Sequence, residues 1–180
     1  VEFEKNKFLF NSIKIIESKK RYYPYQNFSQ IIGYMGQPTQ SSELYSKGVF
    51  HLEKSYEKHL KGTPGKIFSE VNAKGKTIRE ISIEKSIKGN DLDLTLDLSL
   101  QNYAQSQLPR NKKGSIVVIS VSDGSILSMN SNPTFDAQIF EDRENNKIQD
   151  LLNDDQKPLF NRAFSGFYPP GSVFKPISAL

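Results

Sequence analysis

The sequence predicts an α+β protein, in which short antiparallel strands pair as hairpins and a few helices lie between them. Three observations predict this class. Runs of alternating apolar and polar residues come in pairs joined by short turns, which is typical of hairpins. One stretch repeats apolar residues at steps of three and four, as a helix does. The charge and the apolar period both change near residues 89–91, so we place a boundary there between two domains, residues 1–90 and 91–180.

The first half is predicted to be rich in strands. Short strands with glycine bends are expected over residues 1–37, and a loop is expected over residues 38–47. Residues 49–60 are expected to form a helix, because one apolar stripe recurs at helical spacing: Val49, Leu52, Tyr56 and Leu60. The solvent-exposed face of this helix is expected to consist of Glu53, Lys54, Glu57 and Lys58. Residues 66–71 and 76–83 then alternate and predict a hairpin.

The second half is predicted to begin with a strand and a helix. Leucines alternate strictly over residues 91–98 and predict a strand. Asp97 is expected to cap the helix that follows. The buried face of that helix would consist of Leu100, Tyr103, Ala104 and Leu108.

A second hairpin is predicted around the Asp123-Gly124 turn. Residues 115–121 are β-branched and largely apolar, so we expect a central strand there, with residues 125–130 returning beside it. Residues 134–159 are charged and rich in amides, which indicates a loop with short helical pieces.

Composition excludes several classes of function. The chain has no cysteine, so disulfides and thiolate metal sites are excluded, and His51 and His59 stand in no metal-binding pattern. We therefore predict no metal and no cofactor. The net charge is +4, but the densest basic stretch, residues 19–23, is too short to indicate a nucleic-acid site. No window holds 18 consecutive apolar residues. Because the chain opens on Val1 rather than Met, we expect it to be a piece of a longer protein.

The segment "YPPGSVFKPISAL" contains the candidate catalytic pair, Ser172 and Lys175. A serine hydroxyl needs an adjacent base to act as a nucleophile, and residues three apart on a helix lie on one face. A lysine acts as that base when burial or a nearby cation lowers its pKa. Pro176 would disturb the same turn, which favours a functional reason for it. On spacing alone, an ordinary serine at the start of a helix stays open as the alternative.

The bare pattern Ser-x-x-Lys also occurs twice elsewhere, at Ser55/Lys58 and Ser82/Lys85. The first pair falls on the expected solvent-exposed face of a helix, and the second falls in a strand, where residues three apart point to opposite sides. Both are interpreted as surface residues. Only Ser172 follows a Pro-Pro-Gly turn.

Segments along nearly the whole chain resemble those of one family. They are, in order, "RYYPY", "IIGYMG", "HLEKSYEKHLKGTPG", "VNAKGK", "DLTLDLSLQNYA", "GSIVVISVSDGSILSMNSNPTFD" and "PLFNRAFSGFYPPGS", followed by "GSVFKP". The chain resembles class B penicillin-binding proteins, and the elongation type more than the division type. In penicillin-binding proteins, a Ser-x-x-Lys motif carries the nucleophile.

This resemblance implies a fold and an activity. Residues 1–90 would be part of a β-rich, non-catalytic pedestal domain. Residues 91–180 would be the N-terminal portion of a transpeptidase domain, an antiparallel sheet with helices, with the helix of Ser172 packed against that sheet. Ser172 would attack peptidoglycan stem peptides that end in D-Ala-D-Ala, Lys175 would be the base, and β-lactams would acylate Ser172.

The resemblance also implies partners and a location. The parent protein would lie on the periplasmic side of the bacterial inner membrane, anchored by an N-terminal segment that this chain lacks. It would contact a cell-wall polymerase, a glycosyltransferase of the SEDS type. An interaction module without catalysis is the alternative function for the chain as it stands.

The chain departs from the family pattern at several positions. His51 stands where glycine is common, and Val173 stands where threonine is frequent. The family also uses a later Ser-x-Asn and a Lys-Thr/Ser-Gly strand, which do not follow Ser172 here. Ser128-Met129-Asn130 has the letters of the first motif, but it precedes the nucleophile in an expected strand and is rejected. We therefore expect residues 1–180 alone to be inactive.

Overall fold

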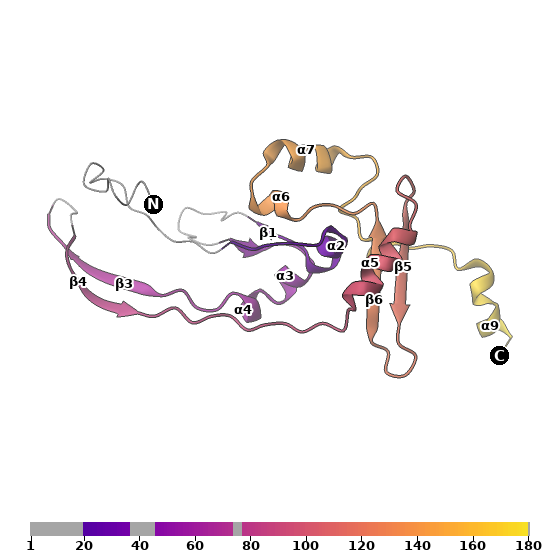
Figure 1. The fold of residues 1–180 in the computed structure, drawn as a ribbon, viewed down its shortest axis with the longest axis horizontal. Helices are drawn as coiled ribbons and strands as arrows, with labels where there is room; N and C mark the ends of the chain where they lie inside the picture. The colour runs from indigo at the N-terminus through magenta and orange to yellow at the C-terminus, as the bar shows by residue number, and fades with distance from the viewer. Residues whose placement is uncertain (1–19, 37–45, 74–76, 180) are drawn as a thin grey trace.

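The computed structural model describes residues 20–36, 46–73 and 77–179 (Figure 1). The predicted α+β class is confirmed, since short helices are combined with antiparallel strands. In chain order, the elements are η2 (Gln26–Phe28), α2 (Ser29–Ile32), β1 (Met35–Gly36), β2 (Lys47–Gly48), α3 (His51–Ser55), α4 (Glu57–Leu60), β3 (Lys66–Val71), β4 (Thr77–Glu84), α5 (Leu98–Gln107), β5 (Gly114–Ile119), β6 (Ile126–Asn132), α6 (Gln138–Glu141), α7 (Asn145–Asn153), α8 (Arg162–Ser165), η3 (Gly171–Phe174) and α9 (Lys175–Ser178).

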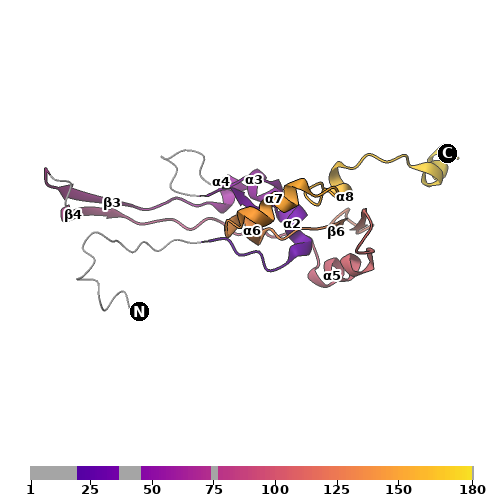
Figure 2. The same cartoon turned by 90° about the horizontal axis from the view of Figure 1, so that it is seen from above.

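The molecule is elongated (Figures 1 and 2). The hairpin β3–β4 extends at one end, α9 lies at the other, and the remaining helices and strands lie between them. Within the described residues the strands form three two-stranded antiparallel sheets, β1–β2, β3–β4 and β5–β6. Both predicted hairpins are confirmed by these pairings.

The prediction of strands over residues 1–37 is confirmed at β1 (Met35–Gly36) and wrong at residues 26–32. Residues 26–32 form η2 and α2 instead, and residues 1–19 lie outside the described part. Phe28, Ser29 and Gln30 are buried in these turns, so tertiary packing overrides the local strand preference of the aromatic residues. Gly33 ends α2 at φ 85°, where a Cβ would clash with the carbonyl oxygen of Phe50.

The predicted helix over residues 49–60 is divided into α3 and α4 by Tyr56, whose φ and ψ are −108° and 18°. The predicted solvent-exposed face is wrong at Glu53, a residue that is only 4% exposed. Arg21 forms an ion pair with Glu53 at 3.1 Å between Nε and Oε1, and the Tyr23 hydroxyl donates to the same carboxylate at 3.3 Å. A carboxylate can be buried here because these two partners reach it from a distant part of the chain.

The strand predicted over residues 91–98 is wrong. The segment is irregular up to Asp97, although Thr95 Oγ1 donates to the carbonyl of Ile126 at 2.7 Å and the Asp97 amide donates to Leu127 at 2.9 Å. Two isolated hydrogen bonds hold the segment near β6 without forming a ladder. Leu94 and Leu98 remain exposed and Leu92 and Leu96 are only partly buried, so the leucine face that predicted the strand does not enter the core.

The helix α5 begins as predicted, because the Asp97 carboxylate accepts a hydrogen bond from the Leu100 amide at 2.7 Å. Its buried face is shifted from the prediction. Gln101 and Ala104 are buried, while Tyr103 is 65% exposed. The helix therefore presents a buried amide, not a row of apolar side chains, to strand β6.

Strand β5 pairs with β6 over six residue pairs, from Gly114 opposite Asn132 to Ile119 opposite Ile126. Within the described residues β5 has a partner on one edge only, and alternate residues along it are exposed. The predicted central position is therefore not seen here. The turn predicted at Asp123-Gly124 is confirmed, with Gly124 at φ 76°. The helical pieces expected in residues 134–159 are α6 and α7.

One hydrophobic core joins the two halves of the chain. Tyr23 and Met35 from the first half pack with Phe135 and Ala137 from the second. Tyr34 stacks on Phe140 with ring centroids 3.7 Å apart. The boundary near residue 90 stays a prediction, but the segments on its two sides share this core.

Candidate active site

Ser172 lies in a tight turn that continues directly into a helix. The turn is the 3-10 helix η3, and α9 begins at Lys175. Gly171, its first residue, has φ 55°, a left-handed conformation that glycine adopts without steric cost. Pro170 precedes it, so the Pro-Pro-Gly sequence sets the direction in which the chain enters the turn.

The 3-10 conformation places Ser172 and Lys175 on the same side. Residues three apart eclipse each other in such a helix. The Lys175 amide donates to the Ser172 carbonyl, which closes the turn between them. Pro176 is accommodated because it occupies the first turn of α9, where a missing N–H is least costly. The expected distortion around Pro176 is therefore a turn of 3-10 helix.

The expected packing of this helix against the sheet is wrong in this structure. Figures 1 and 2 show α9 apart from β5 and β6. No residue from Ala163 to Ala179 is buried, and Val173 and Phe174 are 82% and 50% exposed. The apolar side chains next to Ser172 have no partner surface among the described residues, so the local turn forms without the packing that would enclose it.

The other pairs with the same spacing are surface residues, as predicted. Ser55 and Lys58 are exposed on α3 and α4, on either side of the break at Tyr56. Ser82 and Lys85 are exposed at the end of β4. Neither pair follows a turn comparable to that before Ser172.

Ser128 and Asn130 form part of the protein interior. Both are fully buried in β6, the Asn130 amide donates to Ser128 Oγ at 2.8 Å, and Ser128 Oγ donates to Gln101 Oε1 at 3.0 Å. Both side chains are buried and hydrogen-bonded within the interior, which agrees with the rejection of this Ser-x-Asn as a catalytic motif.

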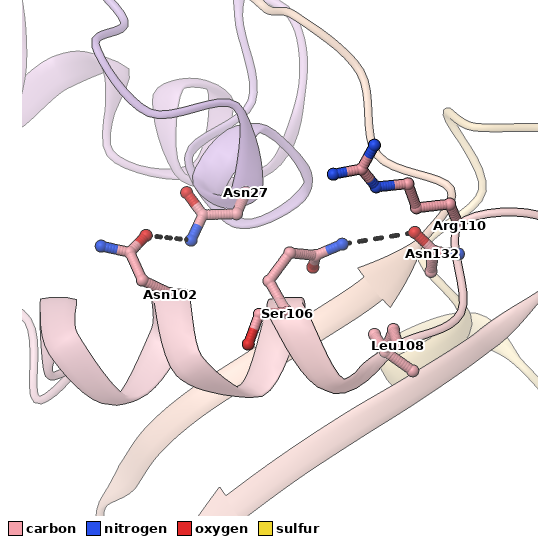
Figure 3. A pocket seen from close by; sticks show the side chains of 7 residues that line it. Asn27, Asn102, Ser106, Leu108, Arg110 and Asn132 are labelled. Carbon is pink, nitrogen blue, oxygen red and sulfur yellow. Dashed lines mark hydrogen bonds between the residues drawn. The ribbon is translucent and has the colours of Figure 1, made fainter.

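A hollow of about 350 Å³ on the described surface lies between η2, α5 and β6 (Figure 3). Its walls are mostly amides: Asn27, Asn102, Gln105, Ser106, Leu108, Arg110 and Asn132. Asn27 donates to Asn102 at 2.8 Å and Gln105 to Asn132 at 3.3 Å, so these amides pair across the hollow. It lies apart from α9 and contains neither candidate catalytic residue.

Several buried polar residues were missed by sequence reasoning, because amides and arginine are usually exposed and no local pattern marks them. Gln30 and Gln101 bridge the two halves of the chain. Arg162 is 5% exposed, and its guanidinium donates to the backbone carbonyls of Lys157 and Phe160, each at 3.2 Å. Asn161 caps α8.

Among the residues that the structure describes, no three His, Cys, Asp or Glu side chains gather as metal ligands would. None of the described helices has the length and apolar character that crossing a bilayer requires.

Comparison with known proteins identifies the family. Residues 1–94 match the penicillin-binding protein dimerisation domain, and residues 114–180 match the penicillin-binding protein transpeptidase domain. The chain therefore belongs to the penicillin-binding proteins, as its resemblance predicted.

Within this family the chain is similar to penicillin-binding protein 2. It is 37% identical to the peptidoglycan D,D-transpeptidase MrdA of Acinetobacter baumannii, over 99% of this chain and 28% of that protein. The solved complex of penicillin-binding protein 2 and MreC from Helicobacter pylori matches with a TM-score of 0.70 and 32% identity, over 87% of this chain and 31% of the other. Pseudomonas aeruginosa penicillin-binding protein 2 in complex with WCK 5153 matches with a TM-score of 0.69 and 28% identity, over 89% and 34%. The chain thus spans about three tenths of the proteins that it matches.

Proposed function

We propose that the protein containing this chain is a serine D,D-transpeptidase that cross-links peptidoglycan, with Ser172 as nucleophile and Lys175 as acylation base. The observation that carries the proposal is the turn that puts both residues on one side, directly after Pro170 and Gly171. Support comes from the match of residues 114–180 to a transpeptidase domain and from the name of the MrdA relative.

In the proposed reaction, Ser172 Oγ attacks the carbonyl carbon of the D-Ala-D-Ala amide of a stem peptide while Lys175 Nζ takes the hydroxyl proton. The C–N bond then breaks, the amine of the terminal D-Ala leaves with a proton, and an ester remains on Ser172. An amine of a neighbouring stem attacks that ester, forms the cross-link and returns the serine hydroxyl. A β-lactam would likewise form an ester with Ser172, but its amine stays attached to the acyl group through the opened ring.

We further propose that residues 1–180 alone do not catalyse this reaction. Ser172 and Lys175 are both exposed in the described structure. An acyl transfer to a serine requires a site that orients the substrate and excludes water. The described residues supply the reacting pair without such a site.

The test is covalent labelling with a fluorescent penicillin. The full-length protein should be labelled, its Ser172→Ala variant should not, and the matched variant Ser178→Ala, six residues further on at the end of α9, should be labelled as the wild type is. Equal labelling of the Ser172→Ala and wild-type proteins would refute the assignment. Residues 1–180 alone should give no labelled band.

A second function is favoured by the hairpin β3–β4, whose apolar side chains are exposed. Ile78, Ile81 and Ile83 on β4 are 60%, 65% and 62% exposed, and Ile67 on β3 is 60% exposed. We propose that this half of the chain binds a protein partner of the cell-wall machinery, a glycosyltransferase of the SEDS type, at the periplasmic face of the inner membrane. The solved complex of a similar penicillin-binding protein 2 with MreC supports the proposal that the protein containing this chain also binds a protein partner.

Co-purification of the full-length protein with that glycosyltransferase tests the second proposal. Changing Ile81 and Ile83 to Ser should reduce the recovered glycosyltransferase, whereas changing the exposed Leu152 on α7 to Ser should not. Unchanged recovery of the glycosyltransferase with the hairpin variant would contradict the proposal. If the hairpin variant instead failed to recover MreC, the surface would be assigned to MreC.

A further inference from the structure

The segment that leads to Ser172 is last buried at the start of α8. Asn161 and Arg162 are each 5% exposed, and no residue after them is buried up to Ala179. Ser172 follows seven residues after the end of α8 at Ser165. Figure 2 shows α8 at the point where the chain leaves the body of the molecule toward α9. Asn161 and Arg162 are therefore the last residues before Ser172 that are held in the interior.

One side of α8 is held by its own half of the chain. The Arg162 amide donates to Ser131 Oγ on β6 at 2.9 Å, and the Arg162 guanidinium binds the carbonyls of the preceding loop. Beyond the helix, the side chain of Tyr168 lies close to Gly166. A Cβ on Gly166 would lie 2.6 Å from the Arg162 carbonyl and 2.7 Å from the Tyr168 hydroxyl.

The other side of α8 is held by the first half of the chain, through Gln30 on α2. Gln30 is 3% exposed. Its side-chain amide donates to the carbonyl of Pro158 and, at 3.0 Å, to that of Pro133. Its backbone carbonyl accepts from Asn161 Nδ2 at 2.8 Å. One residue thus contacts the loop before α8 at two points.

Asn161 joins this contact to α8 itself. Its Oδ1 accepts hydrogen bonds from the amides of Ala163 and Phe164, at 3.1 and 3.0 Å, and so caps the helix, while its Nδ2 donates to Gln30. The same planar amide therefore fixes the start of α8 relative to α2. A movement of α2 changes the position of α8 unless one of these hydrogen bonds breaks.

We propose that Gln30, within the region matched by the dimerisation domain, is a positioning residue for Ser172 and acts through Asn161 and α8. This inference rests on the proposed transpeptidase function. It assigns the non-catalytic half an indirect part in acyl transfer, because the alignment of a nucleophile with its target carbonyl determines the rate once the substrate is bound.

The test compares acylation of the full-length protein by a chromogenic β-lactam in Gln30→Met and Gln101→Met variants. Gln101 is the matched control: it is also a buried amide that ties the first half to β6, through Asn27 and Met129, but its side-chain hydrogen bonds go to Asn27, Ser128 and Met129 and not to residues 156–165. Both variants should lower Tm. Only Gln30→Met should lower the acylation rate constant, by roughly tenfold, with the dissociation constant of the non-covalent complex unchanged.

Asn161→Ser provides a second variant in case Gln30→Met does not fold. Serine keeps the helix cap but cannot reach the Gln30 carbonyl, so acylation should slow to a similar degree. Wild-type acylation rates in both Gln30→Met and Asn161→Ser would overturn the inference and leave the transpeptidase proposal standing. A wild-type protein that is not acylated at Ser172 would overturn both.

Discussion

Replacing Gln101 with Met should strongly destabilise the protein. The side chain is fully buried and makes four hydrogen bonds. Its Nε2 donates to the carbonyls of Asn27 and Met129 at 2.9 and 2.8 Å, and its Oε1 accepts from the Met129 amide and Ser128 Oγ at 2.9 and 3.0 Å. Methionine has a similar length but offers no donor and only a weak acceptor.

The size of the effect follows from those contacts. A net contribution of about 1 kcal/mol for each hydrogen bond gives about 4 kcal/mol. Ser128 keeps its bond from Asn130, and the methionine gains some apolar burial, so the expected loss is about 3 kcal/mol. For a unit of 150–250 residues this corresponds to a fall in Tm of roughly 6–12 °C.

The assay is thermal unfolding of the full-length protein, followed by circular dichroism. Gln107→Met is the control, because Gln107 lies on the same helix, is exposed and donates its side-chain hydrogen bond to its neighbour Ser106. The control should change the free energy of unfolding by less than about 0.5 kcal/mol. A loss below about 1 kcal/mol for Gln101→Met, or equal losses for both variants, would refute the role assigned to the buried amide.

Three further predictions follow from single residues. Asp97→Ala should lower stability by about 1 kcal/mol through loss of the cap on α5, and Asp97→Ser should restore most of it, as read from urea unfolding midpoints. His51 has φ 44°, so His51→Gly should raise Tm by relieving about 1 kcal/mol of backbone strain; a fall in Tm would show that the ring contact with Phe50 outweighs the strain. Burial raises the pKa of Glu53, partly opposed by Arg21, so the folded state binds this proton more tightly than the unfolded state. Stability should therefore fall as pH rises from the ordinary value of 4.5 through the raised pKa, and the Glu53→Gln variant should show a flatter pH profile; an unchanged slope would contradict this.

The elements that could be predicted from sequence depend on neighbours close along the chain. The two hairpins, the Asp123-Gly124 turn and the Asp97 cap each rest on residues within a few positions of one another, and all are confirmed. The turn of Ser172 and Lys175 belongs to the same class, since Pro170 and Gly171 prepare it locally. The role of these two residues in catalysis stays a prediction.

The wrong predictions share a physical cause. Residues 26–32, the buried Glu53 and the leucines of residues 91–98 were judged from local periodicity, but their environment comes from distant segments. A charged residue on a helix is predicted to be exposed unless a partner is known, and the partner of Glu53 lies 32 residues away at Arg21.

Local pattern in the chain thus determines the two hairpins, the Asp123-Gly124 turn and the cap of α5, and it also carries the family resemblance and the spacing of Ser172 and Lys175. Tertiary structure alone decides which polar residues are buried and how the two halves are joined. Gln30 and Pro158 are separated by 128 residues, yet one buried hydrogen bond connects them. A buried amide must find partners wherever the fold brings them, and a short window of sequence contains only one side of each such pair.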